Sequence, residues 1–105
     1  MAATPTEVIK VALQGEIDIE TVKDARGTLQ EACVLDPAAT VLVDMSAVTF
    51  IDSTGLGMLV GASRRMRAAG GDLRLTDPSP RVLIVIELTG LSGTLLVPTP
   101  EDGDA

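Results

Sequence analysis

The sequence is poor in the residues on which most nucleic-acid sites depend. Its 105 residues include no tryptophan and no tyrosine, and Phe50 is the single aromatic residue. Base stacking needs aromatic side chains, and contact with the phosphate backbone needs a basic patch. The chain has a single aromatic side chain for stacking, and with a formal net charge of −7 it offers a poor basic patch. We therefore expect no nucleic-acid partner.

The chain also lacks histidine, the usual general base and a common metal ligand. A serine-hydrolase triad needs such a base, and no Gly-x-x-x-x-Gly-Lys-Ser/Thr phosphate loop is present. The run Asp52-Ser53-Thr54-Gly55 is similar to the Asp-Thr/Ser-Gly of aspartic proteases but has one residue too many. The one cysteine, Cys33, is expected in a helix as a small apolar residue. We expect no enzyme activity, no cofactor and no bound metal.

Long hydrophobic runs are missing as well. No apolar stretch reaches the roughly 18 residues that cross a bilayer, and residues 1–6 carry no basic cluster before an apolar run. These features predict a cytoplasmic protein without a membrane partner. We expect a flexible N-terminus over residues 1–6, one domain over residues 7–98 and an acidic disordered tail over residues 99–105, and a monomer when free.

Hydrophobic periodicity predicts alternating strands and helices. The run Val82–Leu88 fits either, and the N-cap signal of Ser79-Pro80 favours a helix. The expected strands are Val8–Leu13, Val41–Val43, a segment around Leu73 and Leu75, and Thr94–Val97. The expected helices are Val22–Val34, Thr54–Ala69 and Val82–Leu88, and Asp44–Asp52 is expected as a loop that becomes briefly extended. This order predicts an α/β domain with a mostly parallel sheet.

The densest group of unusual residues is Asp52-Ser53-Thr54-Gly55-Leu56-Gly57, where an extended segment is followed by a helix. A helix N-terminus presents free N–H groups and a positive dipole end, so it tolerates an anion or a phosphorylated hydroxyl. Hydroxyl residues are also common as plain helix caps. Both interpretations remain open at this point.

The helix after this loop has two distinct faces. At 100° per residue, the face expected to pack on the sheet comprises Leu56, Leu59, Val60 and Ser63. The opposite face is expected to be exposed and comprises Met58, Gly61, Ala62, Arg65 and Ala69. Methionine and arginine are typical of protein interfaces, although single exposed apolar residues are also ordinary. The basic group Arg64, Arg65 and Arg67 could meet an acidic partner or favour the helix C-terminus.

The segment Val43–Gly57 resembles the signature of the STAS domain, and in particular that of the bacterial anti-sigma factor antagonists. Gly15-Glu16-Ile17-Asp18 is similar to the motif that follows the first strand of that family. Gly70-Gly71 and Thr89-Gly90-Leu91 also match in place and order. The resemblance covers about Val8 to Val97 and implies a STAS-like sheet of four to five strands.

The resemblance implies a partner-switching phosphoprotein that regulates transcription through a sigma factor. The unphosphorylated form would bind an anti-sigma factor that is itself a serine/threonine kinase and so release the sigma factor. Phosphorylation at Ser53 would abolish binding, and a serine phosphatase would reset the switch. The expected partner-binding residues, from the resemblance and the helix face together, are Asp18, Asp52, Ser53, Thr54, Gly55, Met58, Gly61, Ala62 and Arg65. Thr54 is expected to be the helix cap.

The alternative is a STAS scaffold subunit of a stress-signalling or lipid-transport complex, assembled without phosphorylation at Ser53. A stable stoichiometric complex would favour that alternative.

Overall fold

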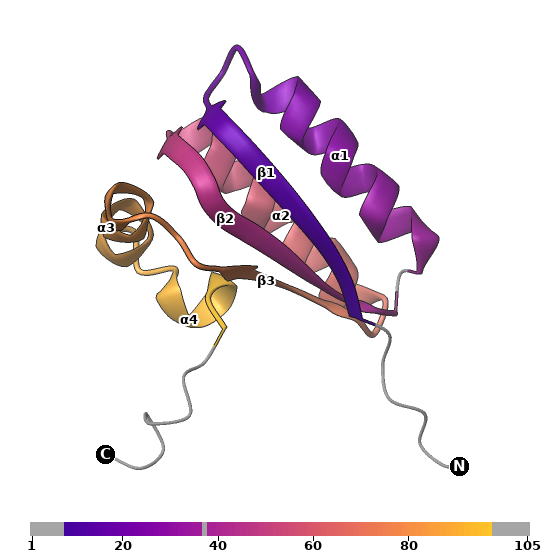
Figure 1. Cartoon of the computed structure of the whole chain (residues 1–105). Helices are drawn as coiled ribbons and strands as arrows, with labels where there is room; N and C mark the ends of the chain where they lie inside the picture. Colours follow the sequence, from indigo (N-terminus) through magenta and orange to yellow (C-terminus); the bar gives the residue numbers. More distant parts are fainter. Residues whose placement is uncertain (1–7, 37, 98–105) are drawn as a thin grey trace.

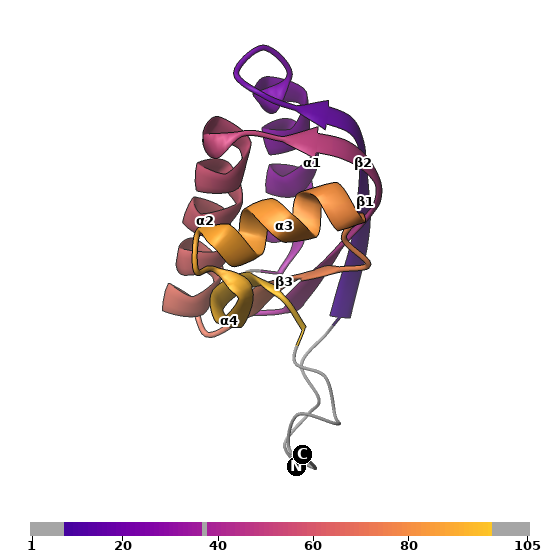
Figure 2. The ribbon, with the colours of Figure 1, turned by 90° about the vertical axis from the view of Figure 1, so that its left-hand side faces the viewer.

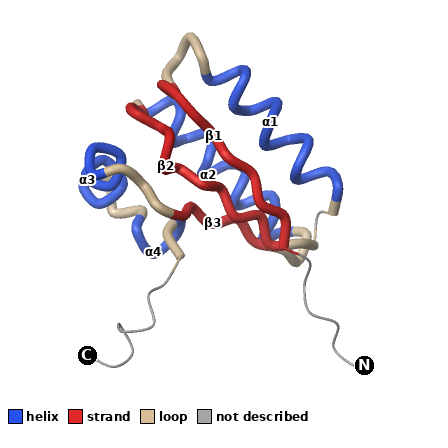
Figure 3. Tube along the Cα trace, viewed as in Figure 1, coloured by secondary structure: helices blue, strands red, loops and turns tan. Residues whose placement is uncertain are grey.

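The computed structural model describes residues 8–36 and 38–97, which form an α/β domain (Figures 1 and 3). The predicted tails at residues 1–6 and 99–105 lie outside these ranges. The described elements are β1 (Val8–Ile17), α1 (Val22–Leu35), β2 (Thr40–Ile51), α2 (Ser53–Ala68), β3 (Asp72–Thr76), α3 (Pro80–Leu88) and α4 (Ser92–Leu95).

The three strands of the described residues form a parallel sheet in the order β1-β2-β3. Parallel strands need crossover connections, and right-handed crossovers in one direction place α1 and α2 on the same face of the sheet. Figure 2 shows both helices on that face. Alternate residues of β2 point into this layer, where Val41, Val43 and Met45 are fully buried. The predicted parallel α/β class is confirmed.

Both long strands extend further than expected. Gly15 does not end β1. It adopts a positive φ of 77°, which glycine tolerates, and the strand continues to Ile17. The pairing of β1 with β2 is irregular around Gly15, with register shifts between Ala12 and Gln14 and between Gly15 and Glu16. The segment expected as a loop after Val43 is also strand, because β2 runs unbroken to residue 51. Residues 44–51 show no clear alternation of apolar and polar side chains, and pairing with β1 keeps them extended.

The C-terminal part combines one confirmed and one wrong prediction. α3 begins as predicted, with Pro80 in its first turn and the Ser79 hydroxyl accepting a hydrogen bond from the N–H of Val82 at 3.4 Å. The strand expected over Thr94–Val97 is wrong, since α4 occupies Ser92–Leu95 and only the bridge between Leu75 and Leu96 extends the sheet. Leu95 is fully buried, so its apolar character serves the core from a helix.

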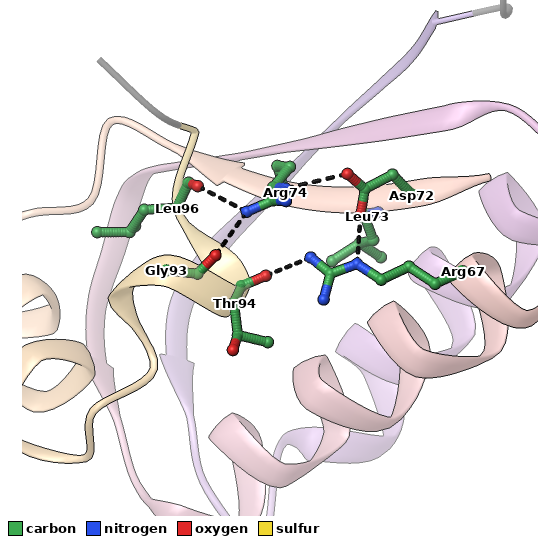
Figure 4. A network of polar contacts seen from close by, with 7 residues as sticks. All are labelled: Arg67, Asp72, Leu73, Arg74, Gly93, Thr94 and Leu96. Atoms are coloured by element: carbon green, nitrogen blue, oxygen red, sulfur yellow. Dashed lines mark hydrogen bonds and ion pairs between the residues drawn. The ribbon is translucent and has the colours of Figure 1, made fainter. Parts of the chain in front are cut away.

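A polar network attaches α4 to the rest of the domain (Figure 4). The Asp72 carboxylate accepts from Nε of Arg67 at 2.7 Å and from Nε of Arg74 at 3.0 Å. The two guanidinium groups also donate to backbone carbonyls at α4, those of Gly93, Thr94 and Leu96. Burial raises the pKa of Asp72, but the hydrogen bonds from Arg67 and Arg74 lower it by more, so the net pKa lies below its ordinary value.

Candidate functional site

The carboxyl ends of β1 and β2 meet at one edge of the sheet. Ile17 is paired with Ile51 in the parallel register, and the N–H of Asp52 donates to the carbonyl of Ile17 at 3.2 Å. Asp18 follows Ile17 directly, and Ser53 follows Asp52. The structure therefore brings together three of the predicted site residues, Asp18, Asp52 and Ser53, at the strand ends where ligands of open α/β sheets usually bind.

Asp52 is the N-cap of α2. Its backbone is extended, with φ −108° and ψ −174°, and its Oδ1 accepts from the N–H of Gly55 at 3.0 Å. Its carbonyl accepts from the N–H of Leu56 at 2.9 Å. The expectation that Thr54 is the cap is therefore wrong, because the carboxylate of Asp52, two residues earlier, takes this role. The interpretation of Ser53 as a plain cap is wrong for the same reason.

Ser53 is consequently the first residue of α2, and its side chain is exposed, whereas Thr54 is half-buried. At this position the hydroxyl lies at the positive end of the helix dipole. It is the more exposed of the two neighbouring hydroxyl groups.

Gly55 fixes the start of α2 against the end of β1. A Cβ atom at this position would lie 2.7 Å from the carbonyl oxygen of Ile17, 2.8 Å from Cγ2 of Ile17 and 2.9 Å from Cγ1 of Ile51. Only glycine permits this approach without displacement of the strand or the helix. Gly55 is buried, and its close approach to β1 places Ser53 at the edge of the sheet, whereas its contact with a partner stays a prediction.

Asp18 organises the turn between β1 and α1. Its carboxylate accepts from the backbone N–H of Thr21 and from that of Glu20, each at 3.0 Å. The hydrogen bond from the Thr21 N–H is the main reason that the pKa of Asp18 lies below its ordinary value. The carboxylate therefore stays negative beside the Ser53 end of the sheet.

The predicted exposed face of α2 is wrong for two of its residues. Met58 is 7% exposed and Ala62 is 3% exposed, and both face a cavity of about 220 Å³ between α1 and α2. α2 lies in a corner, covered by the sheet on one side and by α1 on another, so a second stripe of the helix is buried. Of the remaining residues predicted there, Arg65 is exposed at the rim of that cavity and Gly61 is half-buried.

The surface of α2 that continues from Ser53 carries a shallow depression of about 460 Å³, which we call the α2 groove. Its lining residues are Ser53, Leu56, Gly57, Val60, Gly61 and Arg64 of α2 with Thr89 and Leu91 from the α3–α4 connection. Of these residues, Ser53 and Gly61 belong to the predicted partner-binding set and Arg64 to the predicted basic group. Leu56 and Val60 are expected on the sheet-facing side instead, and Gly57, Thr89 and Leu91 are not predicted as contact residues. The spacing of Ser53, Gly57 and Gly61 at i, i+4 and i+8 could have indicated the α2 side of this groove.

The arrangement defines a small α/β domain with an exposed hydroxyl at the start of a helix and an adjoining apolar groove. Within residues 8–36 and 38–97, no three His, Cys, Asp or Glu side chains lie close enough to hold a metal ion together. Over the same residues, no helix is long and apolar enough to cross a membrane. The candidate site is therefore the exposed Ser53 hydroxyl together with the adjoining α2 groove.

The family follows from comparison with known proteins. The STAS domain model matches residues 1–102, and the chain belongs to this family. Among its relatives is the anti-sigma-B factor antagonist of Listeria monocytogenes, which is 32% identical over 96 residues, 91% of this chain and 83% of that protein. The resemblance to the anti-sigma factor antagonists is confirmed.

Two solved structures have the same fold. The anti-sigma factor antagonist SpoIIAA in its unphosphorylated form superposes with a TM-score of 0.71 and 27% identity over 98% of this chain and 90% of that chain. The phosphorylated form of the Bacillus cell fate determinant SpoIIAA gives a TM-score of 0.63 and 26% identity over 98% of this chain and 93% of that chain. The predicted STAS-like fold is confirmed.

Proposed function

We propose that this chain is an anti-sigma factor antagonist whose binding to its partner is switched by phosphorylation of Ser53. The observation that carries the proposal is the exposed Ser53 hydroxyl at the first position of α2, directly after the Asp52 cap. The names of the relatives support the regulatory role, and SpoIIAA is a structural neighbour that exists in a phosphorylated form. The role is regulatory rather than catalytic.

The α2 groove is the surface on which the unphosphorylated chain receives the anti-sigma factor, a serine/threonine kinase. Gly57 and Gly61 have no side chains that project from α2, so a partner can approach the helix backbone, and Val60 and Leu91 supply apolar contact. The groove has Ser53 at one end and Arg64 at the other, so an apolar partner segment with an acidic residue facing Arg64 fits it. Asp18 and Asp52 lie beside the Ser53 end, whereas Met58 and Ala62 are left out of this surface.

Phosphorylation at Ser53 changes the charge of this surface sharply. A phosphoryl group adds about −1.5 to −2 charges beside the carboxylates of Asp52 and Asp18. Docking would then bury a hydrated dianion against an apolar groove and bring it near any acidic partner residue. Like-charge repulsion and desolvation cost several kcal/mol in such a setting, and ~2.7 kcal/mol already weakens binding about a hundredfold. A serine phosphatase that removes the group restores binding and again frees the sigma factor.

The proposed docking surface is tested with a matched pair of glycine variants. Gly57 lines the α2 groove and Gly27 is exposed on α1, and an added Cβ meets no atom within 4 Å at either position. Gly57→Arg is expected to abolish binding to the purified anti-sigma kinase of the source cell in isothermal titration calorimetry, whereas Gly27→Arg binds like the wild type. Equal binding by both variants contradicts the surface.

The scaffold alternative is separated by the same titration. A permanent complex of the scaffold type would bind its partner equally well with and without phosphate on Ser53. The switch requires tight binding by the unphosphorylated chain and by Ser53→Ala, and a large loss for the phosphorylated chain.

A further inference from the structure

The outer edge of β1 is a second surface suited to binding. Among the described residues, β1 pairs with β2 alone, and it is ten residues long. In an edge strand, alternate N–H and C=O groups point away from the neighbouring strand and can pair with another extended chain. The bulges near Gln14 and Gly15 disturb the ladder to β2 only locally.

A groove runs along this edge beside α1, and we call it the β1 groove. Its volume is about 690 Å³, and in Figure 1 β1 lies between β2 and α1. Its lining comprises residues 12–17 of β1, Thr21, Asp24, Ala25 and Thr28 at the start of α1, and Ala47 of β2, which is paired with Gln14. At one end the Thr21 hydroxyl donates to the carbonyl of Glu16 at 2.7 Å. The carbonyl of Glu16 is thus already hydrogen-bonded, and it is not available to a further strand.

The charge of the β1 groove selects its occupant. Glu16 and Asp24 both line it, and none of its lining residues is a lysine or an arginine. A strand that carries a basic side chain therefore fits, since the two carboxylates in a concave site attract a cation.

The terminal segments of this sequence do not match that charge. Glu7 is the only charged side chain in residues 1–7, and residues 98–105 contain three acidic residues and no basic one. A second copy of the chain would bring its own α1, with a second Asp24, to the same groove. Neither terminal segment supplies a basic side chain, and residues 98–105 and a second copy would bring further carboxylates to the groove.

We propose that the β1 groove binds an extended, basic segment of another protein, which adds to β1 as a further strand. Backbone hydrogen bonds to the edge of β1 provide the affinity, and a lysine or arginine that faces Glu16 and Asp24 provides the selectivity. This surface is distinct from the α2 groove, so the proposal does not depend on phosphorylation of Ser53.

The test is an NMR titration of the full ¹⁵N-labelled chain with a blocked hexapeptide of alternating arginine and valine. One control peptide carries glutamate in place of arginine, and another is N-methylated at alternate amides so that it cannot extend the sheet. Asp24→Lys places a like charge in the groove. Glu87→Lys makes the same charge change at an exposed position on α3, outside the lining.

The basic peptide is expected to shift the amide signals of residues 12–17 and 21–28, and both control peptides are expected to leave them unchanged. Asp24→Lys should weaken binding at least about fivefold, the change that corresponds to one partly exposed charge pair, and Glu87→Lys should weaken it far less. Absent binding, shifts elsewhere, or equal binding of the N-methylated peptide would overturn the proposal. Shifts of the β1 signals with protein concentration alone would assign the groove to a second copy and also overturn it.

Discussion

Gly55→Ala tests the contact that places Ser53 at the edge of the sheet. The new methyl group would lie 2.7 Å from the carbonyl oxygen of Ile17 and within 2.9 Å of a side-chain carbon of Ile51. The oxygen belongs to the backbone of β1 and cannot rotate away, so the start of α2 must move outward. Overpacking of this kind costs about 1–3 kcal/mol.

Helix propensity acts in the opposite direction and sets the control. Replacement of glycine by alanine within a helix stabilises by up to about 1 kcal/mol when nothing obstructs the methyl group. Gly57 meets that condition, because its added Cβ has no atom within 4 Å. Gly57→Ala should therefore raise the free energy of unfolding by about 0.5–1 kcal/mol, and Gly55→Ala should lower it by about 1–2 kcal/mol.

The assay is urea unfolding followed by far-UV circular dichroism, because the chain has no tryptophan or tyrosine to report by fluorescence. The free energies of unfolding of the two variants should differ by about 1.5–3 kcal/mol, with unchanged dependence on urea concentration. If Gly55→Ala proves as stable as Gly57→Ala, the close approach of α2 to β1 is not a constraint, and the placement of Ser53 needs another cause.

Two further predictions concern the rest of the domain. Met58→Glu should lower the free energy of unfolding by at least ~3 kcal/mol in the same urea assay, because it places a carboxylate at a position where the side chain is only 7% exposed. A loss below about 0.5 kcal/mol would mean that the Met58 side chain is exposed after all. Asp72 has a pKa lowered from 3.8 by Arg67 and Arg74, so its stabilisation is fully present above that value and is lost as the pH falls through the lowered pKa. Urea midpoints of the wild type and Asp72→Asn, measured between about pH 6 and pH 2.5, should therefore converge in acid, and a constant gap would contradict the ion-pair network.

The parts of the fold that the sequence predicts well are those with local causes. The Ser79-Pro80 start of α3 is such a case, because cap and proline act within one turn. The extension of β2 to Ile51 was missed, since long-range pairing with β1 overrides local preference. The strand expected over Thr94–Val97 is wrong at Thr94 and Leu95, which belong to α4, because a short apolar run fits either element.

The candidate site divides in the same way. The positions of Asp52 and Ser53 at a helix start were predictable from the motif itself. The buried position of Met58 was not, because a single helical wheel cannot show that α1 covers a second side of α2. The contribution of Leu91 to the α2 groove was not predictable from the sequence either, since it depends on how the α3–α4 connection folds back beside α2.

The central claim is that Ser53 carries the phosphate that switches partner binding. The most direct test is intact-mass spectrometry of the wild type, Ser53→Ala and Thr54→Ala after incubation with Mg-ATP and a lysate of the source cells that contains the anti-sigma kinase. The account predicts one added phosphate group on the wild type and on Thr54→Ala, and none on Ser53→Ala. A phosphate that persists on Ser53→Ala, or none on the wild type with the kinase present, would contradict it.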